Sequence, residues 1–220
     1  MITETIGKIT FICGDSHEAV NHFADNQYDL VLCDPPYGIG MSKPAGLSQK
    51  YSKKKLVDKK WDDKSPPFEF FSSLMRTTKN QIIWGANHFI QKMPMPSPAW
   101  IVWDKRCQIV PPRTYADCEL AWTSFDSPAR IFYFLWDGFL QNQKEVRIHP
   151  TQKPVSLYEY CLMNFAKEGD KILDTHGGSF SSAIACHRLG YELTIYENDL
   201  ETYKDGIKRF NEQTSQGRFF

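Results

Sequence analysis

The sequence predicts an α/β protein built on a mostly parallel, doubly wound sheet. Short apolar runs alternate along the chain with segments whose apolar residues recur at helical spacing, the pattern expected of repeated β-α-β units. Two glycines, Gly177 and Gly178, stand between one such run and the next helical segment. The chain has 220 residues, 41% of them hydrophobic and 24% charged, which suffices for one sizeable core. We therefore expect a single domain over residues 1–220.

In the first half of the chain, the predicted strands are separated by helices. Residues 8–13, KITFIC, predict a strand, and 14–27 predict a turn with a short helix. The run 28–34, YDLVLCD, is too short for a helix and is apolar enough for a buried strand. Two prolines near the start of 65–80 and the helical spacing after them predict a helix, and 81–87 predicts the next strand.

The second half begins with a proline-rich connection, MPMPSP, and then continues the alternation. Three runs rich in aromatic and β-branched residues predict strands over 99–106, 117–125 and 129–136. We expect the last two to pair as an antiparallel hairpin around the turn SFDSPA. The remaining elements are predicted as a helix over 154–166, a strand over 171–174, a helix within 177–190, a strand over 191–199 and a helix over about 200–210.

Composition excludes several classes of protein. No window approaches 18 uninterrupted apolar residues, and the first residues, MITETIGKITF, lack the pattern of a signal peptide, so we expect a cytoplasmic protein without a membrane segment. The six cysteines include no CxxC pair. Their distribution favours reduced structural thiols over disulfides or a metal site.

A lysine-rich segment spans residues 41–64. It contains eight lysines and three aspartates, a net charge of +5, although the whole chain balances 26 basic against 26 acidic residues. The segment is polar, contains glycine and proline and shows no helical period, so we expect a long loop or flap. Such a charge run fits either a solvated loop or a contact surface for a polyanion.

The segment around the glycine pair has the spacing of a nucleoside-binding β-α-β unit. Gly177 and Gly178 follow the carboxyl end of a predicted strand, and Glu197 lies twenty positions after Gly177. Glycines allow a ligand to approach the backbone, and the acid can accept hydrogen bonds from ribose hydroxyls. Neither GxGxxG nor GK[ST] is present, which disfavours a phosphate-bearing ligand. S-adenosylmethionine fits, as do other nucleosides, and a plain helix-entry turn is the structural alternative.

A second group of residues, Asp34, Pro35, Pro36 and Tyr37, ends the predicted strand 28–34. Ligands of doubly wound sheets bind at such carboxyl ends. The two prolines fix φ and donate no hydrogen bond, so the turn is stiff and presents carbonyl acceptors. Asp34 and the Pro35 carbonyl can accept both hydrogens of one amino group, and the Tyr37 ring offers a face for stacking of a planar ring. A packed structural turn is the alternative.

Four motifs in one consistent order resemble those of amino-methylating DNA methyltransferases of the DPPY type. They are DPPYGIG, HPTQKP, DTHGGSFSS and YEND, and the likeness extends from Gly14 and Asp15 to about Phe210. The target-base motif precedes the cofactor motif, as in the circularly permuted class called beta. The resemblance implies a Rossmann-like, S-adenosylmethionine-dependent methyltransferase fold. It also implies a site-specific enzyme that flips a base out of double-stranded DNA and works in restriction–modification.

The resemblance assigns roles to individual residues. Asp34, Pro35, Pro36 and Tyr37 are implied to hold and stack the flipped base beside the methyl group. The residues implied to bind the cofactor are Asp15, Lys153, Pro154, Asp174, His176, Gly177, Gly178, Ser179 and Glu197. Three of them also have a structural interpretation, as a helix cap for Asp15, a solvated side chain for Lys153 and a first-turn proline for Pro154.

The glycine loop departs from the family pattern. Members usually have D-P-F-x-G-S-G followed by two small residues, whereas this sequence has Thr175, His176 and Phe180 in that region. Phe180 adopts positive φ at a higher cost than glycine, so the loop must use an ordinary backbone conformation there or accept strain. We expect His176 to pack on the cofactor in place of the usual Phe. A DNA-binding protein of this fold with impaired catalysis is the alternative.

Asp34, Pro35, Pro36 and Tyr37 form a tetrad. The resemblance favours adenine N6 as the methyl acceptor, because the first residue of this tetrad is Asp34 rather than Ser. Cytosine N4, RNA and protein glutamine are alternative acceptors. We expect no large target-recognition domain, because only residues 137–148 separate the last of the three aromatic-rich strands from His149. Base readout is therefore expected from the flap, from residues 108–115 or from a second copy of the chain in a homodimer. The flap lysines expected to contact DNA are Lys50, Lys53, Lys54, Lys55, Lys59 and Lys60.

Overall fold

Most of the runs predicted as strands meet in one sheet. The computed structural model describes residues 1–40, 60–107, 116–137, 140–142 and 145–215, and within these ranges nine strands form one sheet and two more form a small separate sheet. The strands of the large sheet are β1 (Ile2–Ile6), β2 (Ile9–Cys13), β3 (Tyr28–Cys33), β4 (Thr78–Trp84), β5 (Trp100–Asp104), β6 (Cys118–Thr123), β7 (Arg130–Tyr133), β10 (Lys171–Asp174) and β11 (Glu192–Glu197). The small sheet pairs β8 (Trp136–Asp137) with β9 (Leu140–Gln141).

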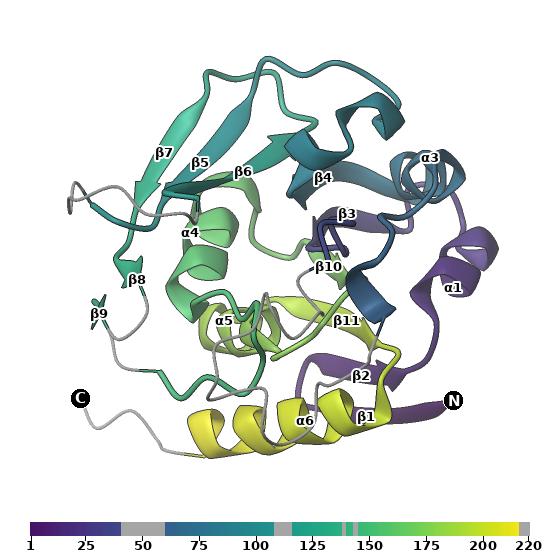
Figure 1. Ribbon diagram of the computed structural model, residues 1–220. Coiled ribbons are helices and arrows are strands. Elements are labelled where there is room, and N and C mark those ends of the chain that lie inside the picture. Colours follow the sequence, from purple (N-terminus) through teal and green to yellow (C-terminus); the bar gives the residue numbers. More distant parts are fainter. Residues whose placement is uncertain (41–59, 108–115, 138–139, 143–144, 216–220) are drawn as a thin grey trace.

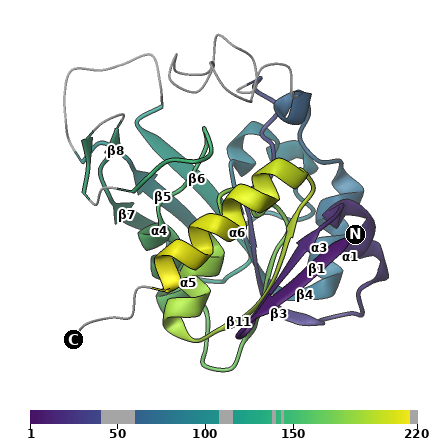
Figure 2. The ribbon, with the colours of Figure 1, turned by 90° about the horizontal axis from the view of Figure 1, so that it is seen from below.

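The helices occupy the predicted segments between these strands. They are α1 (Ser16–His22), α3 (Phe68–Thr77), α4 (Val155–Phe165), α5 (Ser181–Leu189) and α6 (Leu200–Thr214). Three short 3₁₀ turns are η2 (Lys60–Asp62), η3 (Ala86–His88) and η4 (Ile90–Lys92). The helices cover both faces of the sheet, with α1 and α3 on one face and α4, α5 and α6 on the other (Figures 1 and 2). This arrangement confirms the predicted doubly wound architecture.

The parallel centre of the sheet determines where the site lies. The order of the described strands is β1-β2-β11-β10-β3-β4-β6-β5-β7, and the strands from β2 to β4 in this order are parallel. Parallel strands end at the same edge of a sheet. Residues at or just after the strand ends, Asp15, Asp34, Thr175 and Glu197, therefore lie along one edge, where ligands of such sheets bind.

The far side of the sheet differs from the prediction. The expected hairpin between 117–125 and 129–136 is wrong, because β5 lies between β6 and β7, antiparallel to the first and parallel to the second. Ile101 and Trp103 of β5 are buried, and an inner position in the sheet pairs the buried backbone groups on both edges of this strand. β7 is the edge strand of the sheet, and its Ile131 and Tyr133 side chains are exposed. At the opposite edge, β1 forms an unpredicted antiparallel hairpin with β2.

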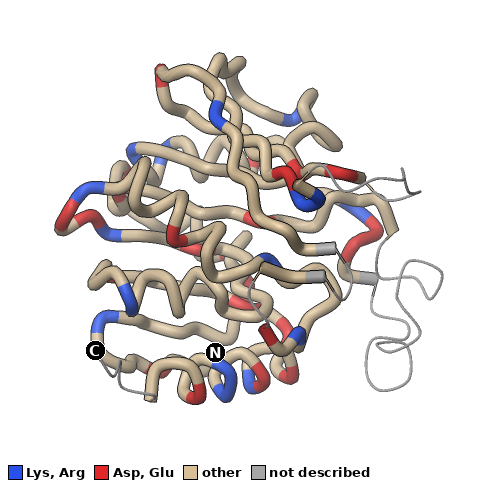
Figure 3. The backbone as a smooth tube through the Cα atoms, turned by 90° about the vertical axis from the view of Figure 1, so that its left-hand side faces the viewer, with Lys and Arg blue, Asp and Glu red and all other residues tan. Residues whose placement is uncertain are grey.

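The described residues also bear on the predictions about membrane segments, cysteines and charge. No helix in the described ranges is long and apolar enough to cross a membrane. All six cysteines are unpaired, in keeping with the predicted free thiols. Basic and acidic positions are intermixed along the described backbone (Figure 3). Most of the lysine-rich segment, residues 41–59, and the whole of 108–115 lie outside the described residues.

Candidate active site

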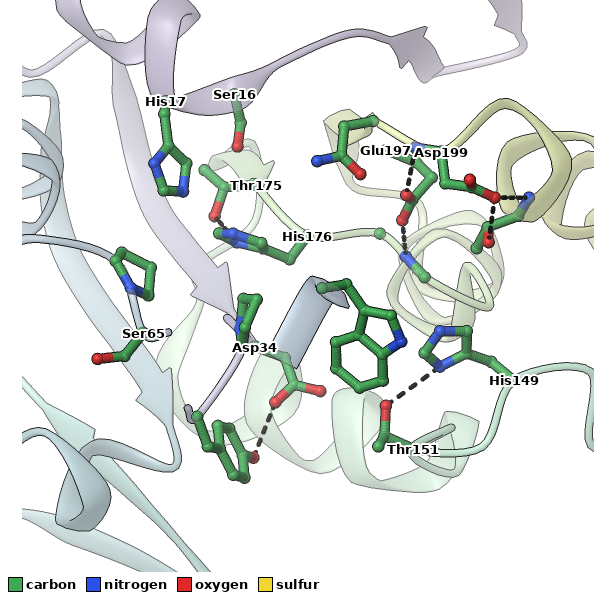
Figure 4. Close-up of a pocket in the computed structure, with 18 of the residues that line it drawn as sticks. Ser16, His17, Asp34, Ser65, His149, Thr151, Thr175, His176, Glu197 and Asp199 are labelled. Carbon is green, nitrogen blue, oxygen red and sulfur yellow. Dashed lines mark hydrogen bonds between the residues drawn. The ribbon is translucent and has the colours of Figure 1, made fainter. Parts of the chain in front are cut away.

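A pocket opens at the carboxyl ends of β2, β3, β10 and β11. Its volume is about 1160 Å³, more than the ~300–1,000 Å³ typical of a pocket for one drug-sized ligand. Asp15, Asp34, His176 and Glu197 line it, one from each strand end. Figure 4 shows Asp34 and Glu197 in this pocket on separate strands. The pocket therefore unites the two groups of residues that the sequence singled out.

The glycine loop is tied to Glu197 through the backbone. Oε2 of Glu197 accepts a hydrogen bond from the Gly178 amide at 2.8 Å, and Oε1 accepts one from the Asp199 amide at 2.8 Å. The amide of Gly177 donates to the Tyr196 carbonyl at 2.7 Å. Burial raises the pKa of Glu197, and these amide donors partly offset that effect. Glu197 thus holds the loop in addition to facing the pocket.

Phe180 accepts the strain anticipated from the sequence. Its φ is +60° and its ψ is +30°, a left-handed conformation unusual for a bulky residue. The ring is fully buried, and it packs against Phe11 and edge-on to Tyr203. A Cβ on Gly177 would lie 2.6 Å from this ring, and one on Gly206 would lie 2.7 Å from it. Two glycines therefore make room for the ring below the loop, on the side away from the pocket.

Asp34 lies at the centre of a buried charged cluster. Its Oδ1 accepts hydrogen bonds from the Tyr37 hydroxyl at 2.9 Å and from the Lys153 ammonium at 2.6 Å. Burial raises the pKa of Asp34, while Lys153 opposes the rise. Burial alone would lower the pKa of Lys153, but the charges of Asp34 and Glu119 outweigh it and raise that pKa.

Glu119 completes this cluster from β6. Its carboxylate lies 3.1 Å from Lys153 Nζ and 3.1 Å from Lys105 Nζ. Burial would raise the pKa of Glu119, but the two ammonium groups outweigh burial and lower it to about 2. Sequence reasoning missed Glu119, because a single acid within an aromatic strand carries no spacing signal.

Asp62 holds the turn that contains the tetrad. Sequence reasoning missed this residue as well. The side chain is buried, and its Oδ1 accepts hydrogen bonds from the amides of Tyr37 at 2.7 Å and Gly38 at 2.9 Å. These are the first amides after the two prolines, which have none to donate. Asp62 was counted only as one of the acids of the lysine-rich segment.

The aromatic ring of Tyr37 packs tightly against its neighbours. A Cβ on Gly85 would lie 2.1 Å from the ring, and the His88 imidazole is stacked on it with centroids 5.4 Å apart. Gly85 has φ of +70°, so this position needs glycine for both its backbone and its contact. The Tyr37 ring is therefore fixed in position just after the carboxyl end of β3.

His176 lines the pocket beside other rings. Its ring contacts His17 and Phe70 edge-on, each with centroids 5.6 Å apart, and its Nδ1 is 2.9 Å from the Thr175 hydroxyl. Burial, aided by His17, lowers the pKa of His176 to about 3, so the ring is neutral. Burial raises the pKa of Asp174 to about 7, and this acid binds the His176 amide at 2.9 Å.

Comparison with known proteins finds similarity to DNA methyltransferases. Residues 102–208 match an N6/N4 methyltransferase family model described as DNA methylase. The Type II methyltransferase M2.DpnII of Streptococcus pneumoniae is 26% identical over an alignment of 245 positions, which covers 92% of this chain and 89% of that protein. M.HpaI of Haemophilus parainfluenzae is 24% identical over an alignment of 236 positions, which covers 89% of this chain and 73% of that protein. The chain is therefore similar over most of its length to amino-methylating DNA methyltransferases.

Solved structures share the fold of the methyltransferase. The PvuII DNA methyltransferase, described as cytosine-N4-specific, aligns with a TM-score of 0.62 at 12% identity over 94% of this chain and 90% of that one. The M1.HpyAVI–SAM complex aligns with a TM-score of 0.55 at 18% identity over 91% and 99%. These likenesses confirm the methyltransferase fold expected from the resemblance.

The structure places most of the expected site residues of the methyltransferase in the pocket lining. Those that line it are Asp15, Asp34, Pro36, Tyr37, Lys153, His176, Gly177, Gly178, Ser179 and Glu197. The remaining three, Pro35, Pro154 and Asp174, lie behind the lining: Pro154 is the N-cap of α4, and Asp174 accepts a hydrogen bond from Ser182 at 2.5 Å. Asp15 is also the N-cap of α1 and accepts from the His17 amide, so its structural role is real.

The expected DNA contacts fall outside what the structure describes. Lys50, Lys53, Lys54, Lys55 and Lys59 belong to the part of the chain that is not described. Lys60 begins η2, and its side chain is likewise outside the description.

Proposed function

We propose that this methyltransferase moves a methyl group from S-adenosylmethionine to the N6 amino group of a flipped adenine in double-stranded DNA. One observation carries the proposal: the Asp34 cluster and the glycine loop with Glu197 face the same pocket. Two ligands can thus meet there, a nucleoside cofactor over the loop and an amino-bearing base at the tetrad. The Type II methyltransferases to which the chain is similar support a role in restriction–modification.

The loop residues fit S-adenosylmethionine. The Glu197 carboxylate accepts the Gly178 and Asp199 amides and has about four lone-pair sites in all, so it can also accept from a ribose hydroxyl. The loop lacks the GxGxxG and GK[ST] patterns of phosphate-binding loops, and this cofactor has no phosphate. When bound, it supplies a methyl group on a sulfonium. The neutral His176 ring provides an apolar face beside the glycines.

The tetrad fits an exocyclic amino group. Asp34 supplies a carboxylate acceptor at the end of β3, and Tyr37 supplies a ring that Gly85 holds in place. Acceptors on the two N–H bonds localise the lone pair of the amino nitrogen, which improves it as a nucleophile for direct transfer. The amino group loses one proton in the reaction, and the raised pKa of Asp34 suits that carboxylate to receive it.

The choice between adenine and cytosine depends on Asp34, the first residue of the tetrad. Asp34 favours adenine N6, in line with the DPPY resemblance. Cytosine N4 is the second candidate, because the PvuII enzyme with the same fold is cytosine-N4-specific. The impaired-catalysis alternative loses support, since the Phe180 ring packs against Phe11 and below Gly177 and leaves the pocket free.

Base extrusion costs a few kcal/mol, which DNA contacts must offset. We propose that the flap lysines provide such contacts and that a second copy of the chain in a homodimer extends the readout.

One assay tests the proposal. The purified chain is incubated with S-adenosylmethionine carrying a labelled methyl group and with unmethylated DNA of mixed sequence, and the DNA is digested to nucleosides for mass spectrometry. Label in N6-methyladenine is expected. Label in N4-methylcytosine would select the second candidate, and label only in parallel RNA or protein samples would refute a DNA substrate.

A further inference from the structure

Glu119 touches the reaction site without lining the pocket. It stands on β6, and β4 separates that strand from β3, which carries the tetrad. Its Oε2 lies 3.1 Å from Lys153 Nζ and 3.3 Å from the Tyr37 hydroxyl. The pocket lining includes Lys153 and Tyr37 but not Glu119. Any effect of Glu119 on a bound base therefore passes through these two groups.

Both groups converge on one oxygen of Asp34. The Tyr37 hydroxyl and the Lys153 ammonium donate to Oδ1, at 2.9 and 2.6 Å. No hydrogen bond from a described residue engages Oδ2 of Asp34. The geometry separates the carboxylate into one oxygen that the protein holds and one that is open to a ligand.

The buried Lys153 ammonium needs a second anionic partner in addition to Asp34. Its side chain is 4% exposed, so the ammonium has lost most of its hydration, and Asp34 alone would have to compensate for it. Glu119 supplies the second carboxylate and is itself balanced from outside by Lys105 at 3.1 Å. The backbone of Lys153 is fixed separately, since its carbonyl accepts a hydrogen bond from the Ser181 hydroxyl at 2.7 Å.

We infer that Glu119 is a positioning residue for methyl transfer: its carboxylate holds the Lys153 ammonium, which donates to Oδ1 of Asp34 and to the Tyr37 hydroxyl oxygen at 3.0 Å and so leaves Oδ2 of Asp34 to accept the amino group of the target base. The inference rests on the proposed function. It adds a residue that acts on the geometry of Asp34 and leaves cofactor binding alone.

Glu119→Gln tests it, since glutamine keeps the size of the side chain and removes its charge. We expect kcat to fall at least ~10-fold, because a displacement of about 1 Å in a reacting group can cost ~100-fold. The Kd for S-adenosylmethionine, measured by calorimetry, should stay within about twofold, since Glu119 does not line the pocket and the Lys153 ammonium that it contacts is directed at Asp34 and Tyr37. Glu119→Asp keeps a carboxylate and should recover part of the lost kcat.

Asp117→Asn is the matched control. Asp117 lies two residues away, is 62% exposed and pairs with Arg106. The same loss of one carboxylate there should leave kcat within twofold of the parent. An equal kcat for Glu119→Gln and the parent would overturn the inference, and so would a loss of kcat that only follows a loss of cofactor affinity.

If the Glu119→Gln variant does not fold, the Glu119→Asp variant provides the test instead. An intermediate kcat with unchanged cofactor affinity then supports the inference, and an unchanged kcat overturns it. The parent protein runs in the same assay. A parent inactive on DNA, RNA and protein would refute the proposed function and this inference together, whereas an active parent beside an unaffected variant refutes the inference alone.

Discussion

The Tyr37 hydroxyl donates a hydrogen bond to Oδ1 of Asp34 at 2.9 Å, three residues back in the same turn. The two prolines between them leave the turn no amide of its own to donate, so this side-chain bond and the Asp62 carboxylate hold its shape. The stacking residue and the acceptor of the tetrad are thereby coupled. A substitution that moves either one should disturb the other.

Asp34→Asn should lower kcat at least ~100-fold, because the reaction loses a preorganised anionic acceptor. The side chain keeps its shape and Lys153 keeps Glu119, so thermal unfolding should remain cooperative. Asp29→Asn makes the same change at the other end of β3, where Asp29 pairs with the exposed Lys79, and should leave kcat unchanged. Normal turnover by a folded Asp34→Asn protein would remove Asp34 from the mechanism.

Gly85→Ala should impair activity by moving the Tyr37 ring. The new Cβ would lie 2.1 Å from that ring, and φ is +70°. Gly190→Ala is the matched control, because Gly190 has φ of +82° with nothing within 4 Å of the added Cβ. Both variants should lose about 1–2 kcal/mol of unfolding free energy from backbone strain. Only Gly85→Ala should lose methyl transfer, and equal activities would contradict the assigned place of the Tyr37 ring.

Glu197→Gln should weaken binding of S-adenosylmethionine by about 1–3 kcal/mol, the range for a hydrogen bond to a charged group. One of its oxygens becomes an amide donor that cannot accept from the Gly178 or Asp199 amides, so the loop also loosens. Calorimetry measures the affinity, with the exposed Glu192→Gln at the start of β11 as control. Unchanged affinity would return Glu197 to a purely structural role.

Acid should destabilise the protein through His176. Burial lowers the pKa of this ring to about 3 from an ordinary value of 6.5, so the unfolded chain binds more protons between these two values. Stability from the neutral ring is complete above pH 6.5 and is lost as the pH falls. We expect up to about 2 kcal/mol of loss between pH 7 and pH 5 that His176→Asn removes.

Denaturant unfolding at the two pH values measures this loss. The exposed His22→Asn serves as control, because it removes one imidazole from the surface and leaves the buried ring in place. Parent and His176→Asn proteins with the same pH dependence would show that His176 is not held neutral.

The lysine-rich segment should dominate the salt dependence of DNA binding. Each neutralised phosphate contributes roughly −0.9 to the slope of log affinity against log salt concentration. Replacing Lys53, Lys54 and Lys55 with Gln should flatten the slope by up to ~3 units and leave the methylated base unchanged. A triple change of the exposed Lys167, Lys204 and Lys208 to Gln controls for net charge. Equal slopes for all three proteins would place the DNA surface elsewhere.

Local sequence determined the elements and the two ligand-binding turns. The run 28–34 became β3 because it is short and continuously apolar, and Asp34 to Tyr37 follow it because two prolines cannot continue a central strand. The glycine pair and Glu197 were found by their spacing, which the parallel pairing of β10 and β11 converts into proximity. Such signals lie within one or two neighbouring elements of the chain.

Only the tertiary structure decided which distant charges meet. Glu119 and Lys153 are brought to Asp34 by the strand order and by the start of α4, and neither lies near Asp34 in sequence. The order of β6, β5 and β7 likewise depends on which side chains the whole sheet can bury. Phe180 keeps a left-handed backbone because Gly206, on the far α6, leaves space for its ring. Burial and long-range pairing set these features, because the free energy of a buried charge or ring depends on all of its neighbours, most of which are remote in sequence.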